Sequence, residues 1–296
     1  MGDQKQQMFT RSIDIPSLPS GMASIVSVAS SESATADDVA NAILLDPALS
    51  TKVLRMANSA FYGRLTKAET VTQAVVTLGF SAVKTVALAA SVVDHVLPEK
   101  GVPGLSWKAF WQHCVATGAA AEIISRHLTG SKRGGESAFV AGLLHDIGKL
   151  IIARNAPDQF AKAVWIATDT NADMCFGERK VFGTDHSTVG ALLAQEWRIP
   201  EAIAGPVGLH HSTDTDASPV VISVRGANVL SKAMYGGYLT DCKIQVTAAE
   251  VTEACGLNEE TIRAVAQEVP QRLAECGEVL SWAGNMPEGG GLRRAA

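Results

Sequence analysis

The sequence is poor in cysteine pairs, aromatic residues, basic runs and long hydrophobic segments. Its five cysteines in 296 residues form no Cys-x-x-Cys pair, which argues against a disulfide framework or zinc knuckle and favours reduced thiols in the cytoplasm. The net charge is −5 and the longest basic cluster is Lys132-Arg133, so a nucleic-acid partner is not expected. The most apolar stretch, 83–93, is broken by Lys84, and the polar N-terminus lacks a signal-peptide core, so no membrane association is expected.

What the chain does contain is typical of closely packed helices. Hydrophobic residues make up 47 %, mainly alanine, valine and leucine, whereas aromatics make up only 5 %. Thr35 and Asp38 form a capping-box pattern, and Asp46-Pro47 forms a helix start. A glycine-rich turn is expected over 130–135, and a strand at 220–224 is weighed against a helix and rejected. The predicted helices after the one that starts at Asp46-Pro47 span 70–78, 81–97, 106–128, 136–144, 160–167, 186–197, 200–211, 218–235, 247–255 and 258–280.

An adjacent histidine and aspartate, His145-Asp146, follow the apolar helical segment 136–144 and lead into Gly148-Lys149. An imidazole nitrogen and a carboxylate oxygen suit the same divalent metal, and a carboxylate can bridge two ions. The alternative is a histidine that ends one helix and an aspartate that caps the next. Lys149 is either a cation beside an anionic group at the metal site or a surface lysine.

Four further histidines stand where helices could bring them to the same place: His113, His186, His210 and His211. Taken singly, each has an ordinary interpretation as a core, helix-end or surface histidine. Taken together with His145 and Asp146, they predict one shared site for a divalent metal such as iron, manganese or zinc. His95 and His127 have no other potential ligands near them in the sequence pattern and are predicted to be on the surface.

The chain resembles the HDOD domain, a bacterial signalling relative of the HD superfamily of metal-dependent phosphohydrolases. The resemblance rests on residues 15–19 (IPSLP), 45–49 (LDPAL), 53–63 (VLRMANSAFYG), 74–79 (AVVTLG), 111–113 (WQH), 141–148 (AGLLHDIG) and 197–200 (WRIP). It implies an all-α HDOD domain over 13–211, with an N-terminal helical bundle (13–100) packed on an HD-like helical core (105–211). Residues 212–285 resemble the helical extension that often follows, and 286–296 are expected to be a flexible tail.

HDOD domains act as regulatory or scaffolding modules beside two-component or cyclic-dinucleotide signalling, so the resemblance implies a signalling protein as partner. Many of them have lost the HD metal ligands. This chain is instead similar to the HD-GYP cyclic-di-GMP phosphodiesterases at seven positions. In those enzymes two or three metals, bridged by the aspartate, activate a water for attack on phosphorus. The seven positions are His113, His145, Asp146, Lys149, His186, His210 and His211.

Two departures from the HD-GYP pattern weaken the case for catalysis. Asn228 stands where those enzymes carry a final aspartate ligand, and the Gly-Tyr-Pro loop is absent after His211. We therefore expect a cytoplasmic signal-transduction module with a retained metal site. The alternative is a metal-dependent phosphohydrolase acting on a nucleotide or cyclic dinucleotide, in which Asp146 and Lys149 would be the catalytic residues.

Overall fold

The computed structural model describes residues 6, 9–17, 23–25, 27–28, 35–58, 67–78, 83, 87, 90, 96, 100–214, 216–236, 246–276, 279 and 281. Within these residues the chain is built from α-helices and contains no β-strand, so the predicted all-α class is confirmed. None of the described helices is both long and apolar enough to cross a membrane.

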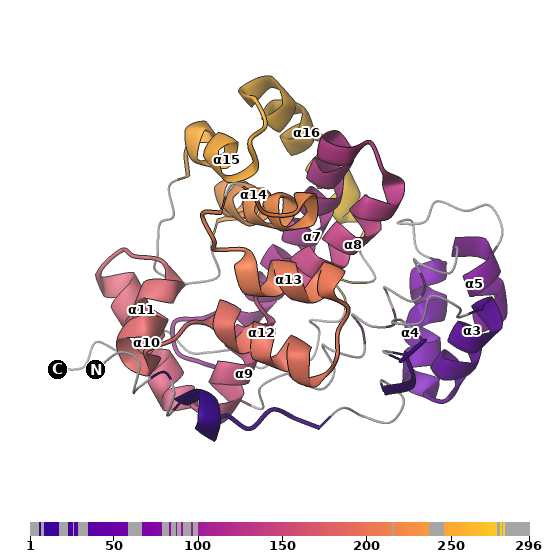
Figure 1. Cartoon of the computed structure of the whole chain (residues 1–296), viewed down its shortest axis with the longest axis horizontal. Helices are drawn as coiled ribbons and strands as arrows, with labels where there is room; N and C mark the ends of the chain where they lie inside the picture. Colours follow the sequence, from indigo (N-terminus) through magenta and orange to yellow (C-terminus); the bar gives the residue numbers. More distant parts are fainter. Residues whose placement is uncertain are drawn as a thin grey trace.

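The N-terminal helices form a small bundle at one side of the molecule (Figure 1). It consists of α3 (Ala36–Leu44), α4 (Pro47–Ala57) and α5 (Val71–Leu78), which pack on one another. The predicted start signals are confirmed: Thr35 and Asp38 form a capping box, and the Asp46 carboxylate accepts from the first amides of α4. Of the predicted helix at 81–97, only residues 83, 87, 90 and 96 are described, and each is helical and buried.

The central core is a set of helices around α7 (Trp107–Thr129). It packs most extensively along α8 (Lys132–Leu144) and α14 (Pro219–Tyr235). A Cβ added to Gly142 on α8 would lie 2.9 Å from the Gly118 Cα, so the two backbones touch where these glycines meet. The core is completed by α9 (Ile147–Asn155), α12 (His186–Glu196) and α13 (Glu201–Leu209).

The outer helices cover this core on two sides (Figure 1). The antiparallel pair α10 (Pro157–Asp169) and α11 (Met174–Phe182) lies beside α9 and α12, and α15 (Ala248–Cys255) and α16 (Glu259–Glu275) lie over α14 and α7. The N-terminal leader also contacts the core, since the Trp197 indole Nε1–H donates to the Pro16 carbonyl at 2.7 Å.

The structure corrects the sequence-based assignment between α7 and α8. The predicted glycine-rich turn over 130–135 is shorter, because Gly130 ends α7 with φ of 66° and Ser131 already caps α8. Gly134 and Gly135 therefore lie within the helix, where they meet Ser125 and Glu122 of α7. Two helices, α9 and α11, were not among the predicted segments, whereas 220–224 lies inside α14 as predicted.

Candidate metal centre

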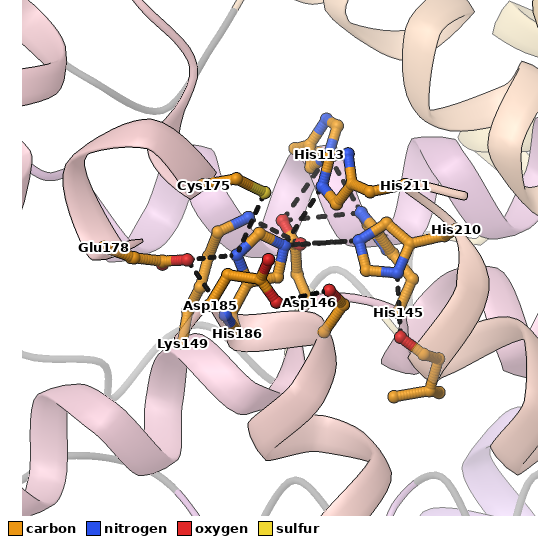
Figure 2. Close-up of polar contacts among 12 residues, drawn as sticks. His113, His145, Asp146, Lys149, Cys175, Glu178, Asp185, His186, His210 and His211 are labelled. Carbon is orange, nitrogen blue, oxygen red and sulfur yellow. Dashed lines mark hydrogen bonds and ion pairs between the residues drawn. The ribbon is translucent and has the colours of Figure 1, made fainter. Parts of the chain in front are cut away.

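The seven residues singled out in the sequence come together in one cluster between α7, α8, α9, α12 and α13 (Figure 2). His113 lies in the second turn of α7, His145 ends α8, and Asp146 and Lys149 open α9. His186 is the first residue of α12, and His210-His211 follow α13. All except His211 are at most 2 % exposed, and His211 is partly buried. The surface interpretation of Lys149 and of the histidine pair is therefore wrong.

A glycine next to the His-Asp pair makes this convergence sterically feasible. A Cβ on Gly148 would lie 2.0 Å from the carbonyl oxygen of His186 and 2.7 Å from the amide nitrogen of Gly190. The start of α9 and the start of α12 are thus in backbone contact, and no side chain fits between them. This contact sets the His186 ring beside Asp146.

Asp146 lies at the centre of the cluster. Its Oδ1 is 3.0 Å from His186 Nε2, 3.6 Å from His210 Nε2 and 2.5 Å from Lys149 Nζ. Its Oδ2 is 3.4 Å from His145 Nε2. Asp146 occupies the N-cap position of α9, yet its side chain makes no capping hydrogen bond. The interpretation of Asp146 as a helix cap is therefore wrong, because the carboxylate points into the cluster instead.

Hydrogen bonds at the outer nitrogens fix the tautomers of two rings, His145 and His210. His145 Nδ1 is 2.7 Å from the Gly142 carbonyl oxygen, and His210 Nδ1 is 2.8 Å from the Val207 carbonyl oxygen. A carbonyl only accepts, so each Nδ1 carries the proton and each Nε2 presents a lone pair to the cluster. That is the arrangement a metal-ligating histidine requires.

The inner nitrogens lie in pairs at close range. The Nε2–Nε2 distance is 3.3 Å for His113 and His145, 3.2 Å for His186 and His210, and 3.2 Å for His186 and His211. In the first two pairs His145 and His210 present a lone pair, which either an Nε2–H of the other ring or a cation can satisfy. A cation between two rings satisfies both nitrogens where each presents a lone pair.

The ionisation states of His113, His145, His210 and Asp146 suit metal binding, whereas for His186 the effect of burial is outweighed by the Glu178 carboxylate, which raises the pKa of that ring. Burial lowers the pKa of His113 to about 3 and also lowers the pKa of His145 and His210, so these rings are neutral near pH 7. Burial works against the charged form of Asp146, but the neighbouring His145 and the Lys149 ammonium outweigh it and hold its pKa well below the usual range. Neutral imidazoles and an ionised carboxylate are the forms that ligate metals.

The donor atoms fall into two groups that share Asp146. One comprises Asp146, His186, His210 and His211, and the other comprises His113, His145 and Asp146; within each, the ligand atoms lie within 4.8 Å of one another. Imidazole nitrogens with a carboxylate oxygen fit zinc, iron or manganese. The residues present therefore fit a divalent metal, with Asp146 able to contact an ion in either group.

Cys175, Glu178 and Lys232, which are outside the predicted set, also interact with residues of the cluster. Glu178 and Cys175 lie on α11 beside His186, and burial together with the charge of Lys149 lowers the pKa of Lys232 on α14. Asn228, also on α14, is 3 % exposed, and its Oδ1 accepts no hydrogen bond within the described part of the chain. No metal-type spacing marks Cys175, Glu178 or Lys232 in the sequence, whereas Asn228 was singled out there by the resemblance to the HD-GYP pattern. His127 is exposed, as predicted, whereas His95 lies outside the described residues.

We compared the chain with protein families and with known proteins. Residues 15–213 match the HDOD domain model. An uncharacterized protein of Treponema pallidum (strain Nichols) is 24% identical over 229 residues, which are 75% of this chain and 43% of that protein. The chain thus spans less than half the length of this relative.

Solved structures of other proteins have a similar fold. A crystal structure of an HDOD domain protein from Geobacter sulfurreducens has a TM-score of 0.74 at 22% identity, covering 93% of this chain and 97% of that one. A crystal structure from Shewanella amazonensis SB2B, provisionally named a phosphohydrolase, has a TM-score of 0.72 at 24% identity, covering 94% and 97%. At these identities the likeness concerns the fold.

Proposed function

The chain belongs to the HDOD domain family, and from that premise we propose that it is a cytoplasmic regulatory module of bacterial signal transduction with a retained divalent-metal centre. The HDOD domain would span 13–211, followed by a helical extension, and the module would act on a signalling protein. The observation that carries the proposal is the convergence of five imidazole Nε2 atoms and one ionised carboxylate in a buried site.

A metal at this site would join segments far apart in the chain. His113 belongs to α7, His145 and Asp146 to the α8–α9 junction, and His186 to α12, and His210 directly follows α13. An ion that binds only the folded arrangement stabilises it in proportion to its affinity and concentration. Occupancy would therefore hold five helices in one arrangement, which suits a module that responds to its metal.

Two features make this module a better proposal than an enzyme. Apart from His211, the ligand residues are at most 2 % exposed, so a substrate has little access to them. Asn228 is neutral, so it offsets no metal charge, which the aspartate of the HD-GYP pattern would do.

The second candidate is a metal-dependent phosphohydrolase acting on a nucleotide or cyclic dinucleotide. What favours it is Lys149, whose ammonium lies 2.5 Å from Asp146 and supplies a cation beside the ligands. When bound, a divalent metal polarises a phosphoryl oxygen and lowers the pKa of its water. Lys149 would then neutralise a phosphate oxygen, while Asp146 and the histidines hold the ion.

Elemental analysis combined with a hydrolysis assay tests the proposal. Wild-type protein purified with added iron, manganese or zinc is expected to carry at least one equivalent of metal, and the isosteric Asp146→Asn variant is expected to carry less. Neither protein should hydrolyse cyclic-di-GMP or bis-p-nitrophenyl phosphate. Metal-free wild type would refute the metal centre, whereas turnover that is lost in Asp146→Asn would favour the second candidate.

A further inference from the structure

His186 is held from outside the ligand set by a carboxylate on a neighbouring helix (Figure 2). Glu178 Oε2 accepts from the His186 backbone amide at 2.9 Å and lies 2.6 Å from His186 Nδ1. Both residues are 0 % exposed. The two contacts fix both the start of α12 and the rotation of the ring about its side-chain bonds.

We propose that Glu178 is a positioning residue for the metal centre: it orients His186, keeps the proton on Nδ1 and makes Nε2 a stronger ligand. This inference rests on the metal centre proposed above. A carboxylate that accepts a hydrogen bond from the outer nitrogen of a ligating imidazole fixes its tautomer and raises its basicity. Removing such a partner typically weakens metal binding by about 10–100-fold.

The burial of Glu178 supports a functional reason for its presence. A buried carboxylate is costly to the fold unless its charge is compensated. Within the described part of the chain, Glu178 Oε1 has no hydrogen-bond partner, so the hydrogen bonds that this carboxylate makes there all go to His186 through Oε2. A divalent ion on the far side of the same ring would supply positive charge near Glu178 in place of a proton on His186.

Direct ligation by Glu178 is the competing arrangement, because Cys175, Glu178 and His186 also form a group of potential ligands. Cys175 Sγ lies 3.9 Å from His186 Nδ1. However, two ligands bound to one zinc ion at about 2.1 Å lie roughly 3.4 Å apart at a tetrahedral angle. The 2.6 Å contact between Glu178 and His186 is that of a hydrogen bond, which favours positioning.

The two ligand groups make the proposal specific. His186 belongs to the group with His210 and His211, whereas the group of His113 and His145 does not contain it. Loss of the Glu178 charge should therefore weaken binding in the first group and leave the second group unchanged.

Cobalt titration of the metal-free full-length chain tests this, read by visible absorption and by calorimetry. Glu178→Gln keeps the shape of the side chain and removes its charge, and we expect about 10–100-fold weaker binding of one cobalt equivalent with an altered spectrum. Glu178→Asp, which restores the charge at shorter reach, should recover part of the affinity and provides the test if Glu178→Gln does not fold. Glu196→Gln, an exposed charge change on α12, is the matched control and should match wild type.

The outcomes separate the proposals. Wild-type affinity and spectrum in Glu178→Gln would overturn the positioning role while leaving the metal centre intact. Loss of the same cobalt equivalent in Cys175→Ser would overturn it in favour of direct ligation by the α11 residues. If wild type binds no cobalt, the proposed metal centre fails and the positioning role fails with it.

Discussion

Replacing Lys149 by methionine is expected to destabilise the metal-free protein strongly and the metal-loaded protein weakly. Lys149 is 1 % exposed, and its Nζ lies 2.5 Å from Asp146 Oδ1. Methionine fills a similar volume, so the main change is the loss of one charge from a buried pair. Removing one partner of such a pair costs about 3–5 kcal/mol, because the remaining charge is left uncompensated.

A bound metal changes this result, because the ion becomes the cationic partner of Asp146. In the metal-loaded protein the loss should therefore fall below about 1 kcal/mol, the size of an ordinary packing change. Urea unfolding with a chelator and with saturating zinc measures both values. Lys162→Met, an exposed substitution on α10, is the control and should stay within about 0.5 kcal/mol of wild type in both conditions.

An equal loss of stability with and without metal would refute the reasoning. It would mean that the ion does not compensate Asp146, and hence that the carboxylate is not a ligand. A small loss in the metal-free protein would also contradict it, because the Lys149–Asp146 pair would then not be the buried pair that the 2.5 Å contact indicates.

Three further predictions follow from separate contacts. Gly148→Ala should lower the free energy of unfolding by about 1–3 kcal/mol and reduce metal content, because the new Cβ would lie 2.0 Å from the His186 carbonyl oxygen. The control is Gly205→Ala, whose Cβ would meet only the end of a glutamate side chain. It should change the free energy of unfolding by less than about 1 kcal/mol. Arg272→Met should lower the free energy of unfolding by about 1–3 kcal/mol and speed amide hydrogen exchange in α16, because the Arg272 guanidinium donates to Glu122 on α7 at 2.8–3.0 Å. Unchanged amide exchange in α16 would contradict this. The metal-free protein should lose stability as pH falls below about 6.5, by about 1.4 kcal/mol per pH unit for each buried histidine of lowered pKa, because the unfolded rings bind protons that the folded rings exclude; a flat profile in urea unfolding would refute this.

The sequence was sufficient to predict the helical class and to single out the residues that come together in the candidate metal centre. The Thr35 capping box and Asp46-Pro47 each define a helix start within a few residues of sequence. In the structure α3 and α4 begin at these positions. The His145-Asp146 pair has a spacing suited to a metal, and the other histidines were grouped with it by their chemistry. Their convergence in space depends on packing between helices, which the sequence pattern alone does not specify.

Glu178 shows what local patterns miss. It lies on α11, a short helix that contains Gly177 and ends at Gly183, and its hydrogen-bond partner His186 is eight residues away. The carbonyls of Gly142 and Val207 that fix two tautomers are also invisible in the sequence, since every residue has one. The helix α8 begins at Lys132, earlier than the predicted residue 136, because close contact of Gly134 and Gly135 with α7 overrides the poor helix propensity of glycine.

The most direct test of the account is an anomalous difference map from crystals grown with zinc, iron or manganese, collected at the absorption edge of the added metal. The account predicts a peak about 2.0–2.2 Å from an Asp146 carboxylate oxygen and from the Nε2 atoms of His186 and His210. The absence of a peak in this cluster at saturating metal, or a peak held by other residues alone, would contradict the central claim that these histidines and Asp146 form a metal centre.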